Sequence, residues 1–538
     1  MKKQKEYRET LIQYLKIQLP KVLSLLDREI YSETYGCFDR EFWHYKSKGY
    51  FNGMIQCYLY SLALFYKKKF RGNYLYQNKK TKKYIIAALN FSVNHCHRDG
   101  SFDEHYYNEH SVAATSFILF SITETVILLD LDHKPFIDYF RKTSKFLLEN
   151  NEKYVRANHI ACTLLGFYNL YLITGEETYQ KNARKLFNDL MKTWSEEGWF
   201  KEYKGCDPGY NTLTLYYLTK YAQKTSSIKV VEIIRKSISF CSYFMHPDYS
   251  YGGYYGSRNT MHFFPYAFEY IQTKNDYGKK MVNSFVKSIS SGNSELLLDD
   301  RFSFLHINNV LEILENFREK RISQPFKGIS TSKYFPEAGI YVYKNKNNRY
   351  QSILNCRKGG IIYIFKKRKL ALRICSIILK TNYGIFKSSN YENVNYEKTE
   401  EGFLIRGKFS LPNKFKRFNP LTSVLFKVFS LTLGYLKIFR DILKRYLIQK
   451  MILNRVKTLV HFSLNIKFGD KIKLNYCIMK EDSKIEIFDV ILSSLFSDIY
   501  VPSSKIFQIH DIVGKDLRLK DITKKKYTKD SIKFSLII

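Results

Sequence analysis

The sequence lacks the patterns that mark several common classes of protein. Its nine cysteines are odd in number and contain no Cys-x-x-Cys pair, which argues against a disulfide framework or structural zinc and favours reduced thiols. No run of about 18 uncharged apolar residues occurs, so no membrane-spanning helix is predicted. Glu6, Arg8 and Glu9 interrupt the stretch where a secretory signal needs an apolar core. We therefore expect no signal peptide, and a cytoplasmic protein that contacts the inner membrane at most peripherally.

Acidic residues are also in short supply. The chain has 50 Asp and Glu against 87 Lys and Arg, a formal net charge of +37 over 538 residues. Such a surplus predicts an acidic partner, namely a polyanionic glycan, a nucleic acid or an anionic membrane surface, although a codon-biased source would produce part of it. No zinc-finger spacing, RNA-binding aromatic motif or basic region joined to heptads is present, so nucleic acid is not expected as a partner. Aromatic residues make up 17% of the chain, a composition that suits sugar rings as well as protein cores.

Loop-like clusters recur along the first 300 residues. Their anchors fall at residues 39, 99, 150, 197, 248 and 299, with successive differences of 60, 51, 47, 51 and 51. A repeat of this length holds two helices of roughly sixteen residues with their connections. Each repeat is therefore predicted to be a helical hairpin, and the loops at the anchors are predicted to share one face, which is the candidate site.

Helical spacing between the anchors predicts twelve helices, at 8–26, 52–67, 80–96, 110–130, 135–149, 157–173, 177–194, 210–223, 228–244, 261–272, 277–289 and 303–318. Segment 110–130 is apolar on nearly all sides, as expected of an inner helix, whereas 177–194 is amphipathic like an outer one. We predict an α+β multidomain protein whose residues 1–325 form an (α/α)6 toroid. An incomplete toroid or open solenoid is the alternative, because a period does not show closure.

After residue 330 the sequence changes to short runs rich in Ile, Val, Tyr and Phe, typical of strands. Residues 330–538 are predicted to form an antiparallel β-sandwich, with strands at 339–343, 360–365, 370–378, 484–492 and 505–510 and a hairpin over 457–478 that turns at Gly469-Asp470. Residues 419–454 interrupt the strands with an apolar helical pattern that carries six cations, Lys427, Lys437, Arg440, Lys444, Arg445 and Lys450. This insertion is predicted either to lie in an anionic membrane surface or to pack on the toroid as a helical hairpin.

Three loop segments carry the residues that could bind or react with a substrate: RDGSFDEHYYNEHS at 98–111, EEGWFKEYKGCDPGY at 196–210 and HPDYSYGGYYGSRNT at 246–260. With YVRANH at 154–159 they resemble the heparinase II/III-like polysaccharide lyases and the related alginate lyases. In that family an Asn-His pair opens a toroid helix, and a Tyr follows about one hairpin later, after an Asp-Gly-x-x-x-Glu type of loop. Here Asn158-His159 is the pair, and Tyr210 follows at a spacing of 51 residues from His159.

The resemblance implies a lyase that cleaves an acidic, uronate-containing polysaccharide by β-elimination, in a link with bacterial surface or exopolysaccharide metabolism. Removing the C5 proton of a uronate requires that the charge of its carboxylate be neutralised. Asn158 and His159, the latter protonated, are assigned to that carboxylate, and Tyr210 to proton transfer, with cations needed to make it a usable base. Substrate-binding roles are predicted for Arg258, which suits a carboxylate, and for Asn259, His262, Glu202, Trp199 and Tyr254.

Other interpretations of these residues stay open. Asn158 could cap the following helix, His159 could be an ordinary first-turn histidine, and Tyr210 and Arg258 could serve packing alone. The acidic side chains Glu104, Glu109, Glu202 and Asp207 would suit a glycoside hydrolase on the same toroid. A uronate epimerase and a non-catalytic glycan-binding protein are further alternatives.

The sequence departs from the family at one place. Family members commonly carry a His near the start of the β domain, in a His-Ala-Asp-like context. The matching stretch here is 357–360, Arg-Lys-Gly-Gly, which puts a second catalytic His and a β-domain metal site in doubt. No metal and no cofactor are therefore predicted.

Overall fold

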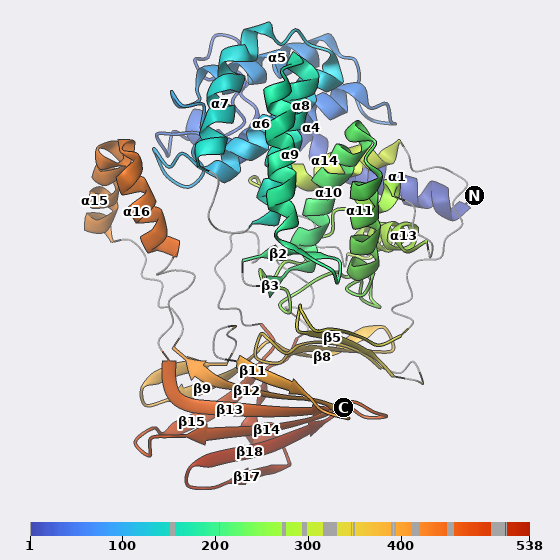
Figure 1. The fold of residues 1–538 in the computed structure, drawn as a ribbon, viewed down its shortest axis with the longest axis vertical. Helices are drawn as coiled ribbons and strands as arrows, with labels where there is room; N and C mark the ends of the chain where they lie inside the picture. Colours follow the sequence, from blue (N-terminus) through green and yellow to red (C-terminus); the bar gives the residue numbers. More distant parts are fainter. Residues whose placement is uncertain are drawn as a thin grey trace.

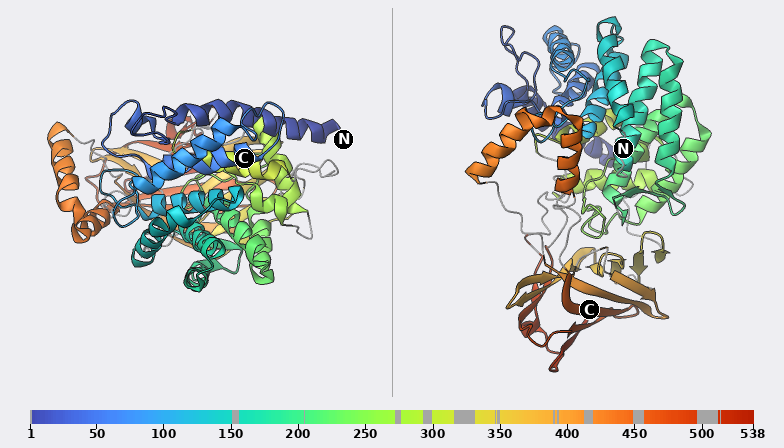
Figure 2. Two further views of the ribbon diagram at one scale, coloured as in Figure 1. Left: turned by 90° about the horizontal axis from the view of Figure 1, so that it is seen from above. Right: turned by 60° about the vertical axis from the view of Figure 1, so that its left-hand side comes forward.

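The computed structural model places a helical region above a β-rich region, with the N-terminal helices and the C-terminal strands at opposite ends of the molecule (Figures 1 and 2). The structure describes residues 2–150, 156–203, 205–271, 276–292, 299–315, 331–345, 347, 350–388, 391, 394–411, 419–448, 457–495, 512 and 514–538. Statements about structure below concern these residues.

The helical region consists of two sets of helices that alternate along the chain. The outer set is α1 (Lys2–Leu25), α5 (Lys79–Asn94), α7 (Ile137–Glu149), α9 (Glu177–Met191), α11 (Ile228–Ser242) and α13 (Tyr277–Ser290). The inner set is α4 (Tyr58–Lys67), α6 (Val112–Leu129), α8 (Ala157–Thr174), α10 (Pro208–Thr225), α12 (Tyr266–Tyr270) and α14 (Ser303–Leu314). Two single turns, α2 (Arg40–Trp43) and α3 (Gly53–Gln56), and the 3-10 turn η1 (Lys134–Phe136) lie in the connections.

The inner helices form a closed ring. Each packs against the next in chain order, and α14 packs back against α4, while α1 contacts both α13 and α14. The predicted toroid of six hairpins is thus confirmed, and it closes because the first and last hairpins meet. Among the described helices, α6 has the length and composition to cross a membrane, but 83% of it is buried inside the protein, as expected of a core helix.

One predicted helix is much shorter than its sequence pattern indicates. Residues 261–272 were expected to be helical throughout, but α12 covers only Tyr266–Tyr270 and begins directly after Pro265. The residues before that proline, which include His262, run as an irregular and fully buried segment. A proline disfavours helical dihedrals in the residue before it, so the apolar pattern here reflects burial rather than helix.

Strands after residue 330 form two antiparallel sheets. The small sheet has the order β4 (Lys333–Phe335), β5 (Ile340–Lys344), β6 (Tyr350–Asn355), β7 (Ile361–Lys366) and β8 (Lys369–Ile374). The large sheet has the order β16 (Leu517–Arg518), β15 (Ile487–Ser493), β9 (Ser376–Thr381), β10 (Gly384–Lys387), β12 (Gly402–Ser410), β13 (Lys457–Lys467), β14 (Lys473–Lys480), β18 (Ser531–Ile537) and β17 (Lys525–Tyr527), and β11 (Val394–Lys398) pairs with β12. A 3-10 turn, η6 (Leu519–Asp521), follows β16.

The small sheet lies between the toroid and the large sheet (Figure 1). Along β7, Ile361, Tyr363 and Phe365 belong to the core that continues into the helices, whereas Ile362 and Ile364 belong to the core shared with the large sheet. Alternate side chains of a strand point to opposite faces, so both faces of β7 are buried. The predicted β-sandwich is present, and the toroid adds a third layer to it.

Two strand predictions need comment. Residues 370–378 were predicted to form one strand, but they contribute to β8 and β9, which belong to different sheets and meet at Cys375. The hairpin of β13 and β14 has the predicted position, with Lys467 paired to Lys473 across the turn. The predicted strand at 505–510 lies outside the described residues.

Residues 420–448 form a helical hairpin, α15 (Pro420–Leu431) and α16 (Lys437–Ile448), joined by the 3-10 turn η3 (Leu433–Tyr435). One side of the hairpin rests on the toroid loop of residues 98–111. Asn108 donates to the carbonyl of Ser430 over 2.9 Å, Lys444 donates to the carbonyl of His110 over 3.2 Å, and the rings of Tyr106 and Phe426 lie 5.2 Å apart. The packed hairpin that the sequence offered as an alternative is therefore present.

Candidate active site

The candidate site lies at the end of the toroid where the inner helices begin. Helix α8 begins at Ala157 and α10 at Pro208, and the small sheet approaches the toroid at this end, near the short strands β2 (Trp199–Glu202) and β3 (Gly205–Cys206) (Figure 1). Unsatisfied backbone N–H groups and the helix dipole make a helix N-terminus favourable for anions. The ring thus directs several such ends toward one region, the face that the repeat predicted.

A buried carboxylate connects two of the predicted site residues. Glu202, at the end of β2 (Trp199–Glu202), accepts hydrogen bonds through Oε1 from the backbone N of Asn158 at 3.1 Å and from its Nδ2 at 2.7 Å. Its Oε2 lies 3.2 Å from Nη1 of Arg258. Burial raises the pKa of Glu202, while the charge of Arg258 and the bonds from Asn158 oppose that rise. Glu202 therefore orients Asn158 and Arg258.

This geometry changes the interpretation of Asn158. The residue is fully buried, and its side chain donates to Glu202 instead of accepting from the first turn of α8. The capping position of α8 is Arg156, so the predicted N-cap role of Asn158 is wrong. The amide nitrogen of Asn158 is therefore engaged by Glu202, which also pairs with Arg258.

Arg258 lies against two tyrosines. Its guanidinium carbon is 3.8 Å from the ring centroid of Tyr210 and 4.9 Å from that of Tyr203. Arg156 lies over the same Tyr203 ring at 5.5 Å. Burial lowers the pKa of Arg258, but Tyr210, Tyr203 and Glu202 outweigh it and raise that pKa, so the guanidinium stays charged. Cation-π contacts between desolvated groups are worth about 2 kcal/mol, so these contacts fix the position of both rings.

Both histidines of the predicted site have a lowered pKa. Burial lowers the pKa of His159 well below its ordinary value, and the charges of Arg156 and Arg258 lower it further. The pKa of His262 is lowered in the same way, by burial, by His306 and by Arg258. Burial and the two nearby guanidinium groups thus disfavour the protonated form of His159 that the sequence predicts. The ring of His262 contacts that of Tyr210 edge-on, at 5.3 Å.

Asp207 fixes the start of α10 and the loop that carries Arg258. Its carboxylate caps the helix by accepting from the N of Tyr210 at 3.0 Å, accepts from the N of Arg258 at 2.8 Å, and also bonds the hydroxyl of Thr260. Asp207 is fully buried. Since Asp207 and Glu202 are both occupied in this way, they do not form the pair of exposed acids that a hydrolase needs.

The remaining predicted residues lie at the junction with the β region. Trp199 donates through Nε1 to Glu197 at 2.9 Å, and Glu197 accepts from the backbone N of Ala338 at 2.9 Å. Lys358, from the turn after β6, donates through Nζ to the carbonyl of Tyr254 at 2.6 Å, to that of Gly256 at 2.7 Å and to Oδ1 of Asn259. Trp199, the backbone of Tyr254 and Asn259 therefore take part in contacts across the junction.

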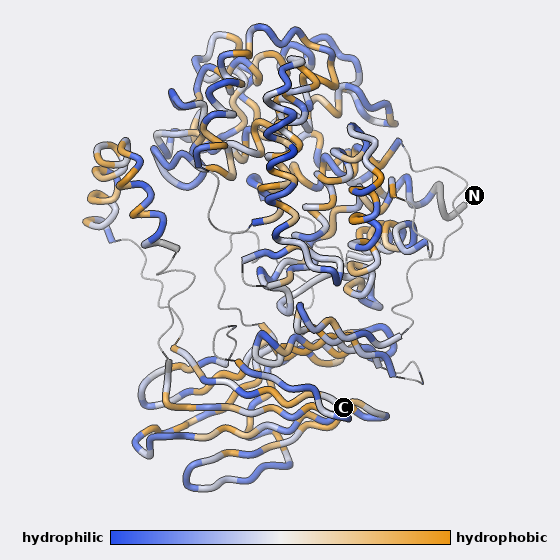
Figure 3. The backbone as a smooth tube through the Cα atoms, viewed as in Figure 1, coloured by the Kyte–Doolittle hydropathy of each residue, from blue (hydrophilic) through white to orange (hydrophobic). Residues whose placement is uncertain are grey.

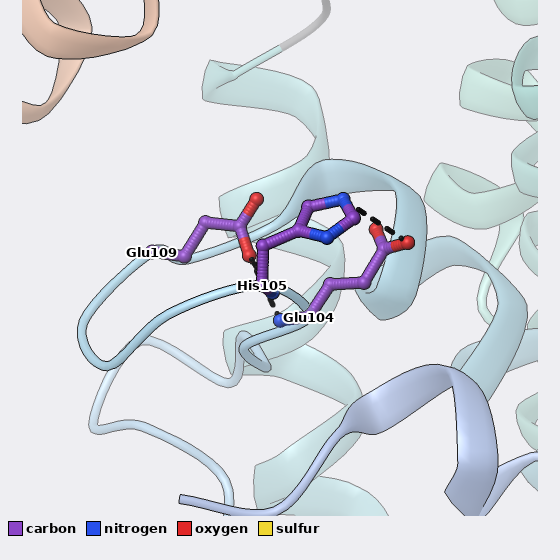
Figure 4. Close-up of side chains that lie close together, drawn as sticks. All are labelled: Glu104, His105 and Glu109. Carbon is purple, nitrogen blue, oxygen red and sulfur yellow. Dashed lines mark hydrogen bonds and ion pairs between the residues drawn. The ribbon is translucent and has the colours of Figure 1, made fainter. Parts of the chain in front are cut away.

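A second polar cluster occupies the loop before α6 (Figure 4). Glu109 accepts through one oxygen from the backbone N of Glu104 at 2.9 Å and of His105 at 2.6 Å, and Nε2 of His105 lies 3.4 Å from Glu104. One ligand atom from each of the three residues lies within 4.8 Å of the others, a spacing that could hold a metal ion. The backbone bonds of Glu109 show that it also braces the loop.

Sequence reasoning missed three contributors to the site: Arg156, Tyr203 and Lys358. Arg156 stands inside the quoted segment YVRANH, and its position beside the Asn-His pair was a usable signal. Tyr203 lies at the turn between β2 and β3 (Gly205–Cys206) with a φ of 55°, which no local pattern indicates. Lys358 lies in the stretch 357–360 where the sequence departs from the family pattern, and only the packing of the two regions shows its target.

A closed helical toroid joined to stacked antiparallel sheets is a fold that this chain shares with polysaccharide lyases of known structure. Residues 72–262, which contain Asn158, Tyr210 and Arg258, match the family model of the ulvan lyase N-terminal domain. No curated protein matches the sequence. With the solved structures below, this match confirms the predicted resemblance to heparinase-like polysaccharide lyases.

Solved structures of polysaccharide lyases share the fold. A Paenibacillus xanthan lyase matches 90% of this chain with a TM-score of 0.53 and 10% identity, and the match covers 46% of that protein. The Streptomyces coelicolor A3 chondroitin AC lyase, in complex with chondroitin sulphate, matches 90% of this chain and 68% of its own length with a TM-score of 0.54 and 8% identity. The chain thus spans about half the length of the xanthan lyase, and identities this low show the common fold alone.

Proposed function

We propose that this protein cleaves an acidic, uronate-containing polysaccharide by β-elimination. The observation that supports this most is the charged Arg258 guanidinium, 3.8 Å from the ring of Tyr210 and paired with Glu202. β-Elimination needs a group that transfers a proton next to a cation that stabilises negative charge. This arrangement brings the two together in one place.

Each residue has a role in the proposed reaction. The substrate carboxylate approaches the positive region between Arg156 and Arg258, beside His159. The phenolate oxygen of Tyr210 takes the C5 proton, and the C5–H electron pair forms the C4–C5 double bond as the C4–O4 bond breaks. O4 leaves with that bond's electrons and takes the proton back from Tyr210, so the tyrosine is regenerated. The products are an unsaturated uronate at one new end and a free hydroxyl at the other.

His159 would respond to the substrate. Burial and two arginines lower its pKa in the structure. A bound carboxylate would offset the positive potential of Arg156 and Arg258 at the imidazole. The histidine would then hold a proton more readily and could donate to the substrate, the role that the family resemblance implies for it.

The test compares two tyrosines that contact the same arginine. Purified wild type is incubated with ulvan, xanthan, chondroitin sulphate and other acidic glycans, and with a neutral glucan, and the ultraviolet absorbance of an unsaturated uronate is recorded. On a substrate so identified, Tyr210→Phe removes the proton-transferring oxygen and should lower turnover by about 10²-fold or more. Tyr203→Phe, at 4.9 Å from the same guanidinium, should keep most of the turnover.

Tyr476→Phe serves as the matched control, because this hydroxyl is buried in the large sheet without a hydrogen-bond partner among the described residues. It should leave both turnover and melting unchanged. Near-normal turnover in Tyr210→Phe would remove Tyr210 from the mechanism. New reducing ends without the absorbance would replace the lyase by a hydrolase, and binding without products would leave a glycan-binding protein.

A further inference from the structure

The helical hairpin of residues 420–446 carries an unusual concentration of exposed apolar side chains. Eleven of the 29 exposed large apolar residues of the described chain lie on it. Figure 3 shows the many hydrophobic positions along its two helices. They are Leu421, Val424, Leu425, Val428, Leu431, Leu433, Tyr435, Leu436, Ile438, Ile442 and Tyr446, with exposed fractions from 44% to 67%. An apolar patch of this kind on a soluble surface marks an interaction site.

These side chains form one stripe on each helix. On α15 the exposed residues Leu421, Leu425 and Val428 follow the spacing i, i+4, i+7, and on α16 Ile438 and Ile442 follow i, i+4. Residues at such spacings share one face of a helix. The side of α15 that meets the toroid is different, because it contains the partly buried Phe426 and the buried Ser430.

The charge of the hairpin indicates what covers this stripe. Residues 420–446 contain five basic side chains and a single acidic one, Asp441. Arg440 is buried and donates to the carbonyls of Gly434 and Tyr435, which fixes the turn between the helices. Lys427, Lys437 and Arg445 remain exposed on the hairpin. Of the six cations counted in the sequence, Lys450 lies outside the described residues.

We propose that this hairpin docks the protein on an anionic lipid bilayer, with the apolar stripe in the headgroup region and the three exposed cations on the lipid phosphates. A helix with an apolar face flanked by Lys and Arg lies in the plane of a membrane surface. Docking leaves the contacts of Asn108, Tyr106 and Lys444 with the toroid intact, since these occupy the other side of the hairpin. The bilayer would therefore bind the whole protein through this hairpin.

The experiment measures co-sedimentation of the full chain with phosphatidylcholine vesicles that contain or lack phosphatidylserine. We expect sedimentation with the anionic vesicles alone, and release by salt. Lys427→Gln with Lys437→Gln should weaken binding by about fivefold for each cation removed. Lys80→Gln with Lys83→Gln removes the same charge from exposed positions of α5 and should change binding little.

The apolar contribution has its own matched pair. Leu425→Ser with Ile442→Ser, at exposed fractions of 59% and 54%, should abolish binding. Ile17→Ser with Ile228→Ser, at 70% and 74% on α1 and α11, should not change it. Equal recovery with neutral vesicles, no recovery with either kind, or equal losses in the control variants would overturn the proposal. Vesicle-independent self-association that Leu425→Ser abolishes, seen by sedimentation equilibrium, would assign the stripe to a second copy of the chain instead.

Discussion

Lys358 joins the two parts of the molecule at the site, and replacing it tests whether that junction matters. The side chain is 4% exposed, and its Nζ donates to two backbone carbonyls and one amide oxygen in the loop of residues 254–259. Lys358→Met keeps most of the aliphatic stem and removes the ammonium. The three oxygens then lose their common donor, and the loop that carries Arg258 loses its attachment to the small sheet.

The magnitude follows from the number of acceptors. A buried group left without its partner costs about 1–3 kcal/mol. Three such acceptors give the upper limit of the loss in the free energy of unfolding. Part of this loss is offset because the variant no longer buries a charged ammonium group. We therefore expect a loss of about 3 kcal/mol in the free energy of unfolding.

Two measurements check this expectation. Chemical denaturation gives the change in unfolding free energy, and amide hydrogen exchange should show faster exchange in residues 253–260. Turnover should fall as well, because Arg258 is no longer held against Tyr210. Lys369→Met, at an exposed position at the start of β8, is the control. If Lys358→Met matched that control in stability, exchange and turnover, the junction would not depend on this lysine and the reasoning would be refuted.

Two further predictions concern buried ionisable groups. Glu202→Gln removes the charge partner of Arg258 and should cost about 3–5 kcal/mol of stability; a melting temperature equal to that of wild type would contradict the pairing. Burial lowers the pKa of His306 to about 3, opposed by the hydrogen bond that His306 donates to the backbone of Phe263. Because the pKa of His306 is lower in the folded state, the contribution of the neutral imidazole to the free energy of unfolding is fully present above the unfolded-state pKa of about 6.5. It is lost as the pH falls toward 3, by up to about 1.4 kcal/mol per pH unit. Between pH 7 and 4 the free energy of unfolding, measured by chemical denaturation, should therefore fall less steeply in His306→Gln than in wild type. Identical slopes would show that His306 does not contribute to the acid sensitivity.

The helices could be predicted from the sequence because each is buried either along one face or on all sides. Both kinds of burial leave a pattern of apolar residues that the sequence shows. The sheets were less predictable. Residues 370–378 form one apolar run, yet the chain turns from one sheet into the other at Cys375. Local pattern records that a strand is buried and does not record which sheet it joins. The segment before Pro265 was misassigned for a related reason, since burial without regular structure leaves the same apolar composition.

Within the site, the predictable part was the part with a fixed spacing. Asn158 and Tyr210 begin successive inner helices, so a regular hairpin length brings them to the same end of the toroid. Their actual partners were not predictable. Glu202 comes from a short strand and Lys358 from another region of the chain, and neither contact follows from a periodicity. The lowered pKa of His159 follows from its burial and then from two arginines, and only the folded structure shows both.

The small sheet, buried on both faces, has a consequence for how the protein is made. During synthesis the toroid leaves the ribosome first, and the end that will hold Arg258 and Tyr210 stays uncovered until residues 340–374 arrive to cover it. The sheet in turn has no face suited to water, because Tyr363 and Phe365 need the helices and Ile362 and Ile364 need the later strands. A ribosome that stops near residue 330 would release a chain with an open apolar end, and the finished junction would exist only after the later strands have been translated.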